Sequence, residues 1–405
     1  MNLSMPAAHP ACEPAPPTHQ ADSRRFTLDG SPELEARLAR TCAQILAGLR
    51  GLLPVEKLEA VLLGGGYGRG EGGVLITADG DRPYNDLEFY VCLRGNRHLN
   101  ELRHRRPLEV LGQILTPQAG VEVEFKIASL DEFTRSPISM FSYDLVAGHR
   151  LLLGRDGLLD GCAHHAVVGK IPLSEATRLL MNRCSGLLFA RERLERPGLF
   201  TAEDADFVRR NIAKAQLAFG DAVLTAHGRY HWSCRERWRR LQLLASVQAP
   251  PWLASVRHHH TVGVDFKLHP ERCTYSRARL AGLHAEVTEL GLAVWLWIES
   301  RRLDAVFLSA GDYVDNPMDK CPETTGVRNL LVNLKVQDHG LGWIKDRPFR
   351  HPREKILHAL CMLLWEPSLL DSYIWRERLH TELRTKAADL PGLVSAYRSL
   401  WAQIN

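Results

Sequence analysis

The stretch that decides the fold is residues 58–71, LEAVLLGGGYGRGE. It begins with an apolar run, Leu58–Leu63, which predicts a buried strand. Five glycines follow within seven positions, so the backbone of the turn can approach a ligand that a Cβ atom would exclude. Inward-pointing N–H groups in such a turn favour an anion, most naturally a phosphate chain, and Arg69 adds donors suited to phosphate oxygens. The turn matches neither a P-loop nor the GxGxxG spacing of dinucleotide sites.

A pair of acids opens the second predicted strand, residues 86–93, DLEFYVCL. Asp86 and Glu88 are two positions apart, so both carboxylates project from the same face of the strand. Two like charges so close repel each other, and proteins usually tolerate this only when a cation lies between them. Oxygen ligands of this kind suit Mg²⁺ or Mn²⁺. The sequence therefore predicts a divalent metal site beside the glycine turn.

The third predicted strand, residues 121–127, alternates apolar and polar side chains. Glu122, Glu124 and Lys126 share one face, and either glutamate can supply a third carboxylate. Three carboxylates beside a phosphate-binding turn form the arrangement for two-metal phosphoryl or nucleotidyl transfer. A helix is expected around residues 99–114, which makes the segment an α/β module.

The glycine turn and the acid-x-acid strand together resemble the DNA-polymerase-β-type nucleotidyltransferase superfamily. Residues 65–71 are similar to the turn of the PII-uridylyltransferase type, and a small sheet domain followed by helices is similar to the aminoglycoside adenylyltransferases. The specific likeness covers roughly residues 58–128. The chain departs from the family in its long link between Glu71 and Asp86 and in the glutamate at its second acidic position.

The resemblance implies an enzyme that binds an NTP with two Mg²⁺ or Mn²⁺ ions and moves a nucleoside monophosphate to an acceptor hydroxyl, releasing pyrophosphate. It implies Glu122 as general base, with Glu124 as the alternative. In two-domain members the helical domain supplies a basic residue to the phosphates, for which Lys214 is the first candidate and Arg183 the second. The implied catalytic residues are Asp86, Glu88, Glu122 and Glu124, and the implied metal ligands are Asp86, Glu88 and Glu122. The implied nucleotide-binding residues are Gly65, Gly66, Tyr67, Arg69 and Lys214.

The acceptor stays open at this point. A small hydroxylated molecule fits the resemblance in layout, and a protein side chain or a tRNA end is the alternative. A tRNA reader should present a continuous basic stripe, which would place residues 235–240 on the cleft side. A rival interpretation is a non-catalytic nucleotide sensor or interaction module, which predicts an incomplete or occluded carboxylate cluster.

The rest of the chain predicts a second, mostly helical domain. The expected fold is α+β or α/β, with a small nucleotidyltransferase-type mixed sheet and flanking helices in residues 26–170. A helical domain follows in 171–405, with a further division near 250–275, and residues 1–25, rich in Pro and Ala, predict a disordered tail. Helical periodicity is found at 174–196, 202–227, 234–245, 277–302, 353–364, 367–384 and 390–403.

Several other motifs favour structural interpretations. Three consecutive histidines, 258–260, cannot all face one ion in regular structure, so they predict a solvated loop. Residues 235–240, RERWRR, could contact RNA, but they favour the wet face of a helix whose Trp238 and Leu241 pack inward. Residues 143–154 predict the last strand region of the module, with Asp144 as a helix cap or a ligand.

Composition indicates a cytoplasmic protein with no membrane partner. The chain has 51 basic and 47 acidic residues, and a net charge of +4 is too small to argue for nucleic acid, which stays possible but not favoured. Nine cysteines show no CxxC, and their odd number excludes complete pairing, which favours reduced thiols. The N-terminus has no signal-peptide pattern, and the most apolar stretch, 290–298, is too short to span a bilayer.

Overall fold

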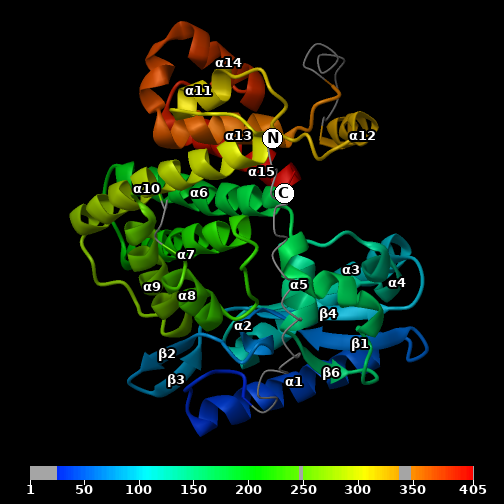
Figure 1. Ribbon diagram of the computed structural model, residues 1–405. Coiled ribbons are helices and arrows are strands. Elements are labelled where there is room, and N and C mark those ends of the chain that lie inside the picture. The colour runs from blue at the N-terminus through cyan, green and yellow to red at the C-terminus, as the bar shows by residue number, and fades with distance from the viewer. Residues whose placement is uncertain (1–24, 246–249, 337–347, 405) are drawn as a thin grey trace, which may run out of the picture.

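The computed structural model describes residues 25–245, 250–336 and 348–404. The predicted tail, residues 1–25, lies outside the described residues except for Arg25. A part that contains the sheet occupies residues 25–170, and helices make up the rest of the described chain (Figure 1). Within the described ranges, no helix combines the length and apolar character needed to cross a membrane.

A four-stranded mixed sheet forms the centre of the first part. Its strands β1 (Leu58–Leu63), β4 (Leu87–Leu93), β5 (Val123–Ala128) and β6 (Arg150–Leu153) lie in the order β5-β4-β1-β6. β4 and β5 are parallel, and β1 is antiparallel to β4 and β6. A separate hairpin joins β2 (Val74–Thr77) to β3 (Gly80–Pro83). The three strands predicted around the glycine turn are therefore present, and the mixed sheet is confirmed.

Two long helices cover one face of this sheet. α1 (Pro32–Leu52) begins at Ser31, whose side chain accepts a hydrogen bond from the Leu34 N–H, and α3 (Arg97–Ala119) connects β4 to β5. Apolar residues of both helices pack against Val61, Phe89 and Val91 in one core. Since side chains alternate along β4 and β5, the residues between these apolar positions are left on the opposite face. That face carries Glu88 and Glu124.

The other elements of the first part are short, and the second part is helical (Figure 1). One apolar core runs continuously from α6 to α15 and includes residues on both sides of 250–275. The short elements are α2 (Gly65–Gly68), α4 (Leu130–Arg135), α5 (Met140–Ala147) and 3₁₀ turns at Asp160–Ala166 and Val168–Lys170. The helices that follow are α6 (Leu173–Glu195), α7 (Ala202–Ala226), α8 (Cys234–Gln242), α9 (Leu253–Leu268), α10 (Arg277–Leu303), α11 (Ala310–Asp315), α12 (Gly326–Val336), α13 (Arg353–Leu360), α14 (Tyr373–Leu383) and α15 (Leu390–Ile404). A π turn at Cys361–Trp365 and a 3₁₀ turn at Pro367–Asp371 link α13 to α14.

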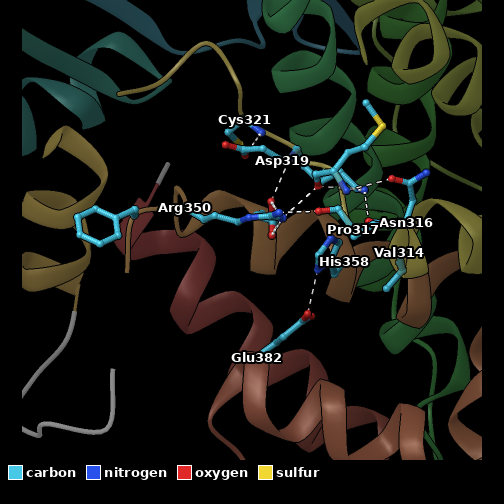
Figure 2. A network of polar contacts seen from close by, with 12 residues as sticks. Val314, Asn316, Pro317, Asp319, Cys321, Arg350, His358 and Glu382 are labelled. Carbon is cyan, nitrogen blue, oxygen red and sulfur yellow. Dashed lines mark hydrogen bonds and ion pairs between the residues drawn. The ribbon is translucent and has the colours of Figure 1, made fainter. Parts of the chain in front are cut away.

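A polar network fixes the loop after α11 to α13 (Figure 2). Arg350 Nη1 donates to both oxygens of Glu354, at 2.9 and 3.1 Å, and to the Met318 carbonyl at 3.0 Å. The Lys320 N–H donates to Glu354 at 2.9 Å, and the Lys320 ammonium donates to the Asn316 carbonyl at 2.7 Å. These groups satisfy one another inside the C-terminal helices, far in sequence from the glycine turn.

The histidine run, 258–260, is helical, so the predicted solvated loop is wrong. It lies in α9, and His259 and His260 are only 3% and 0% exposed. Gln216 Nε2 lies 2.8 Å from His259 Nδ1, and His260 Nε2 lies 3.1 Å from Asp221 Oδ1. Polar partners on α7 compensate for the burial of the two imidazoles, and no local sequence pattern predicts those partners. The two rings contact different residues rather than one common ion.

Two predictions about side-chain direction and local structure also fail. Trp238 is 40% exposed, whereas Arg237 is 3% exposed because it lies beside Asp221 inside the protein. Leu241 is fully buried as predicted. Residues 143–147 belong to α5 rather than to a strand, and only Arg150–Leu153 forms β6. Asp144 therefore lies within a helix, and it does not cap one.

Candidate active site

Three carboxylates gather on the face of the sheet opposite α1 and α3. Asp86 directly precedes β4, and Glu88 pairs in register with Glu124 on the parallel strand β5. One oxygen from each of the three lies within 4.8 Å of the others, close enough to bind one metal ion. The acid-x-acid spacing and the neighbouring strand therefore bring the acids together in the way that strand geometry dictates.

Glu122 is outside this group, although the sequence places it among the metal ligands. β5 begins only at Val123, and Glu122 is exposed just before it. The Glu122 carbonyl accepts a hydrogen bond from the Leu87 N–H at 2.8 Å, while its side chain is not part of the acidic cluster. Glu124 is the third acid of the assembled cluster because it lies directly opposite Glu88.

A lysine and a tyrosine, neither expected at the site, complete the cluster. Lys126 Nζ lies 3.5 Å from Glu88 Oε1 and 3.1 Å from Glu124 Oε2. The Tyr90 hydroxyl donates to Glu88 Oε2 at 3.2 Å. The alternation of residues 121–127 already places Lys126 on the face of Glu124, so the sequence contained a signal for it. Tyr90 has the same relation to Glu88.

The charges of the cluster perturb one another. Burial, followed by the charges of Glu88 and Glu124, raises the pKa of the Asp86 carboxyl, and Lys214 partly offsets this. Burial alone would lower the pKa of the Lys126 ammonium. The charges of Glu88 and Glu124 outweigh this effect, so the pKa of Lys126 is raised. Lys126 is therefore an ammonium at neutral pH.

The glycine turn packs directly against the acidic strand. The Gly64 N–H donates to the Glu88 carbonyl at 2.9 Å, and a Cβ atom at Gly64 would lie 2.5 Å from the Tyr90 ring. Gly65 has a φ of +62°, and a Cβ atom there would lie 3.6 Å from Glu88 Oε2. A Cβ atom at Gly66 would lie 2.9 Å from the Glu71 carbonyl. Glycine is required because the turn approaches both the strand and its own chain.

Tyr67 is a structural residue of this turn rather than a nucleotide contact. Its side chain is buried, with 1% exposure. Its hydroxyl donates to the Gly73 carbonyl and accepts from the Tyr84 N–H, both at 2.9 Å. The ring thus fixes the segment that leads to Asp86, and the hydroxyl has no free donor for a phosphate.

Arg69 also differs from its predicted phosphate-binding role. Arg69 Nε donates to the Gly65 carbonyl at 2.9 Å, and Nη1 donates to Asp144 Oδ2 at 3.1 Å and to the Trp232 carbonyl at 2.8 Å. The guanidinium therefore binds its own turn, α5 and the segment before α8. Its partners are 75 and 163 positions away in the sequence for Asp144 and Trp232, so no local pattern could predict this.

A second set of contacts attaches the helical part to the turn. Glu71 accepts hydrogen bonds from Ser233 Oγ at 2.5 Å and from the Cys234 N–H at 2.8 Å, at the start of α8. The Tyr230 hydroxyl donates to Asp144 at 3.2 Å. Burial alone would raise the pKa of the Glu71 carboxyl, but the charge of Lys267 and the hydrogen bonds from Ser233 and Cys234 outweigh it, so this pKa is lowered. The carboxylate is thus a fixed acceptor that holds the two parts together.

Unpaired cations of the helical part act on the acids. In the described ranges, Arg183 on α6 and Lys214 on α7 make no hydrogen bond or ion pair. The charge of Asp221 acts most strongly on Arg183 and that of Glu88 acts more weakly, whereas the charge of Asp86 acts on Lys214. Burial, reinforced by Arg183, lowers the pKa of Lys214. These two side chains were the first and second candidates for a basic contact from the helical domain, and both are free to bind an anion beside the acidic cluster.

A groove of about 1090 Å³ opens beside Glu124. It follows β5, and its other walls come from α3, α4 and α5 and from Arg178 and Arg328 of the helical part. Glu124, Lys126 and Tyr90 line both the groove and the cluster, so a molecule in the groove would lie next to the carboxylates. The RERWRR run contributes instead to a different hollow, of about 630 Å³, together with Arg25 and Arg69.

Comparisons with known proteins return no match. No model of a protein family, no curated protein and no solved structure is similar to this chain. The functional interpretation therefore depends on the site itself.

The cysteines form no disulfide in the described part of the chain. Among the described residues, all eight cysteines are free thiols.

Proposed function

We propose that this chain is a metal-dependent nucleotidyltransferase with the fold of that superfamily in its first part. The observation that carries the proposal is the acidic cluster of Asp86, Glu88 and Glu124 near the unpaired cations Arg183 and Lys214. Acids on one side suit divalent ions, and cations on the other suit the oxygens of a triphosphate. Glu88 and Glu124 pair with Lys126, whereas Asp86, Arg183 and Lys214 make no ion pair among the described residues.

The donor set fits Mg²⁺ or Mn²⁺. Its members are carboxylate oxygens, which hard divalent ions prefer, and no ion pair reaches Asp86 among the described residues. A bound ion would neutralise the triphosphate and stabilise the departing pyrophosphate. Asp86 and Glu88 would hold it, with Glu124 beside them.

Other residues of the chain bind the two substrates and move the proton. Arg183 and Lys214 bind the phosphate oxygens of the NTP, and the groove along β5 holds the acceptor. The acceptor oxygen forms a bond to the α-phosphorus as the bond from that phosphorus to the bridging oxygen breaks, and pyrophosphate leaves with the electron pair. Glu124 lies where the groove meets the cluster and takes the proton of the acceptor hydroxyl. Glu122 also lines this groove, but it is solvent-exposed and lies outside the acidic cluster.

The test is pyrophosphate release from each of the four NTPs with Mg²⁺ or Mn²⁺, with cell extract as the source of acceptors. Asp86→Asn and Glu124→Gln keep side-chain shape and remove the charge, so both should abolish release. Glu122→Gln is the matched control, two positions away, and should retain most of it. Equal loss in both glutamate variants would refute the assignment of Glu124, and no release from the unmodified chain would refute the transferase.

A nucleotide sensor is the second candidate, and one observation favours it. Lys126 pairs with two of the three acids, which partly occupies the cluster. A sensor would bind an NTP without releasing pyrophosphate. Equilibrium binding of the α,β-methylene analogues of the NTPs, measured beside the release assay, separates the two functions. Because the RERWRR run does not line the groove, we favour a small or extended acceptor over a tRNA end.

A further inference from the structure

Lys126 places a permanent positive charge inside the acidic cluster. Its ammonium lies 3.1 Å from Glu124 Oε2 and 3.5 Å from Glu88 Oε1, so it bridges two acids on neighbouring strands. The contact is built into the sheet, because Tyr90 and Lys126 follow Glu88 and Glu124 in the same parallel register. The ammonium also lies 5.6 Å from the centre of the Tyr90 ring, which favours a cation on that side.

This position coincides with one that a divalent ion would need. Two-metal sites hold ions about 3.5–4 Å apart, each bound directly to carboxylate oxygens. An ion shared by Glu88 and Glu124 would have to compete with Lys126, whose ammonium already bridges one oxygen of each carboxylate. Both cannot occupy that space, and the repulsion between an ammonium and a divalent ion at such a distance is large.

The charges favour one divalent ion. Asp86, Glu88 and Glu124 carry three negative charges and Lys126 carries one positive charge, which leaves a net charge of −2. One divalent ion neutralises this, whereas two would leave an excess of positive charge before the nucleotide binds. Among the described residues, Lys126 makes no ion pair with Asp86, and the Glu88 oxygen that Lys126 does not contact, Oε2, accepts from the Tyr90 hydroxyl.

We propose that Lys126 replaces one of the two metal ions, so that the cluster binds a single divalent ion between Asp86 and Glu88. This proposal rests on the proposed function, since it describes how the same site meets its substrate. The ammonium remains beside Glu124 and supplies the second positive charge next to the groove, where the acceptor lies. Lys126 is thus a charge-supplying residue of the site rather than a surface lysine.

The experiment counts metal ions per bound nucleotide. The full chain is saturated with the α,β-methylene analogue of whichever NTP binds, and Mn²⁺ is titrated while electron paramagnetic resonance measures free and bound ion. The unmodified chain should bind one Mn²⁺ per nucleotide, and Lys126→Met should bind two, with the broadened signal of two nearby ions. Lys170→Met, which removes an exposed lysine outside the site, is the matched control and should behave as the unmodified chain.

Each other outcome has a distinct meaning. Two Mn²⁺ ions per nucleotide in the unmodified chain would overturn the role of Lys126 and leave the transferase proposal intact. One ion in both the unmodified chain and Lys126→Met would also overturn it, because the lysine would not be what excludes the second ion. Absence of analogue and Mn²⁺ binding in the unmodified chain, with circular dichroism showing it folded, would overturn the proposed function and this inference with it.

Discussion

Replacing Arg69 by methionine should destabilise the chain and leave its affinity for nucleotide nearly unchanged. Methionine preserves much of the side-chain length and removes the donors to Asp144, to the Trp232 carbonyl and to the Gly65 carbonyl. Asp144 would then keep the Tyr230 hydroxyl as its nearest donor. The alternative role, a phosphate contact, predicts the opposite pair of effects.

The size of the loss follows from burial. The side chains of Arg69 and Asp144 are 12% and 21% exposed. Breaking a fully buried ion pair costs about 3–5 kcal/mol, and the partial exposure of Asp144 reduces this to about 2–3 kcal/mol. Burial already raises the pKa of Asp144, while Arg69 and Arg237 oppose the rise, so removing Arg69 should raise it further.

That shift makes the loss depend on pH. A carboxyl whose pKa is raised in the folded state above its unfolded value contributes stability below the unfolded value and loses it as pH rises through the folded value. The destabilisation by Arg69→Met should therefore be smaller at pH 5 than at pH 8. Urea unfolding at the two pH values measures this, and Asp144→Asn combined with Arg69→Met should cost less than the sum of the single changes. Unchanged stability with a clear loss of nucleotide affinity would refute the structural role of Arg69.

Three further changes test other parts of the structure. Lys214→Met should raise KM for the NTP about fivefold, which corresponds to about 1 kcal/mol for an exposed charged contact. It should leave the free energy of unfolding unchanged. A lower stability with an unchanged KM would contradict this role of Lys214. Gly65→Ala should cost about 1–2 kcal/mol of stability, because φ is +62°, and should weaken Mn²⁺ binding, whereas the control Gly228→Ala, at φ +64°, should lose only stability. Burial and nearby arginines lower the pKa of His351 from 6.5 to about 4, so the unfolded chain takes up its proton first and stability falls as pH drops through this window, by up to about 3 kcal/mol. His351→Asn should flatten the pH dependence of unfolding between pH 6.5 and 4, and an unchanged slope would show that other groups cause it.

Local patterns predicted the elements that depend on local geometry. The apolar run before the glycines forms β1 within the predicted bounds, Leu58–Leu63, and the acid-x-acid pair shares a face because strands alternate. The helices at 174–196 and 202–227 match α6 and α7 to within about one residue, since their apolar periodicity is long and regular. What failed were the predictions that depend on a distant partner. His260 is buried because its ring has a polar partner in Asp221. Trp238 is exposed because the neighbouring Arg237 points inward and pairs with Asp221.

The choice between Glu122 and Glu124 illustrates the same division. Alternation along one strand places both on the polar face and cannot separate them. The pairing of Glu88 with Glu124 in the parallel sheet separates them, and that register depends on how α3 returns the chain to β5. Register is a tertiary property, so a single sequence with no alignment leaves it open.

Two pairs of cationic residues around the site differ in whether they have an acidic partner. Arg69 and Arg237 are paired with Asp144 and Asp221, and each joins segments distant in the sequence. Their charges are neutralised within the fold, so replacing either arginine should lower the stability of the protein more than its affinity for a ligand. Arg183 and Lys214 have no partner among the described residues although burial depresses the pKa of both. Lys214 is exposed and Arg183 is half-buried, so both charges remain available to an anion that binds beside the metal-binding acids.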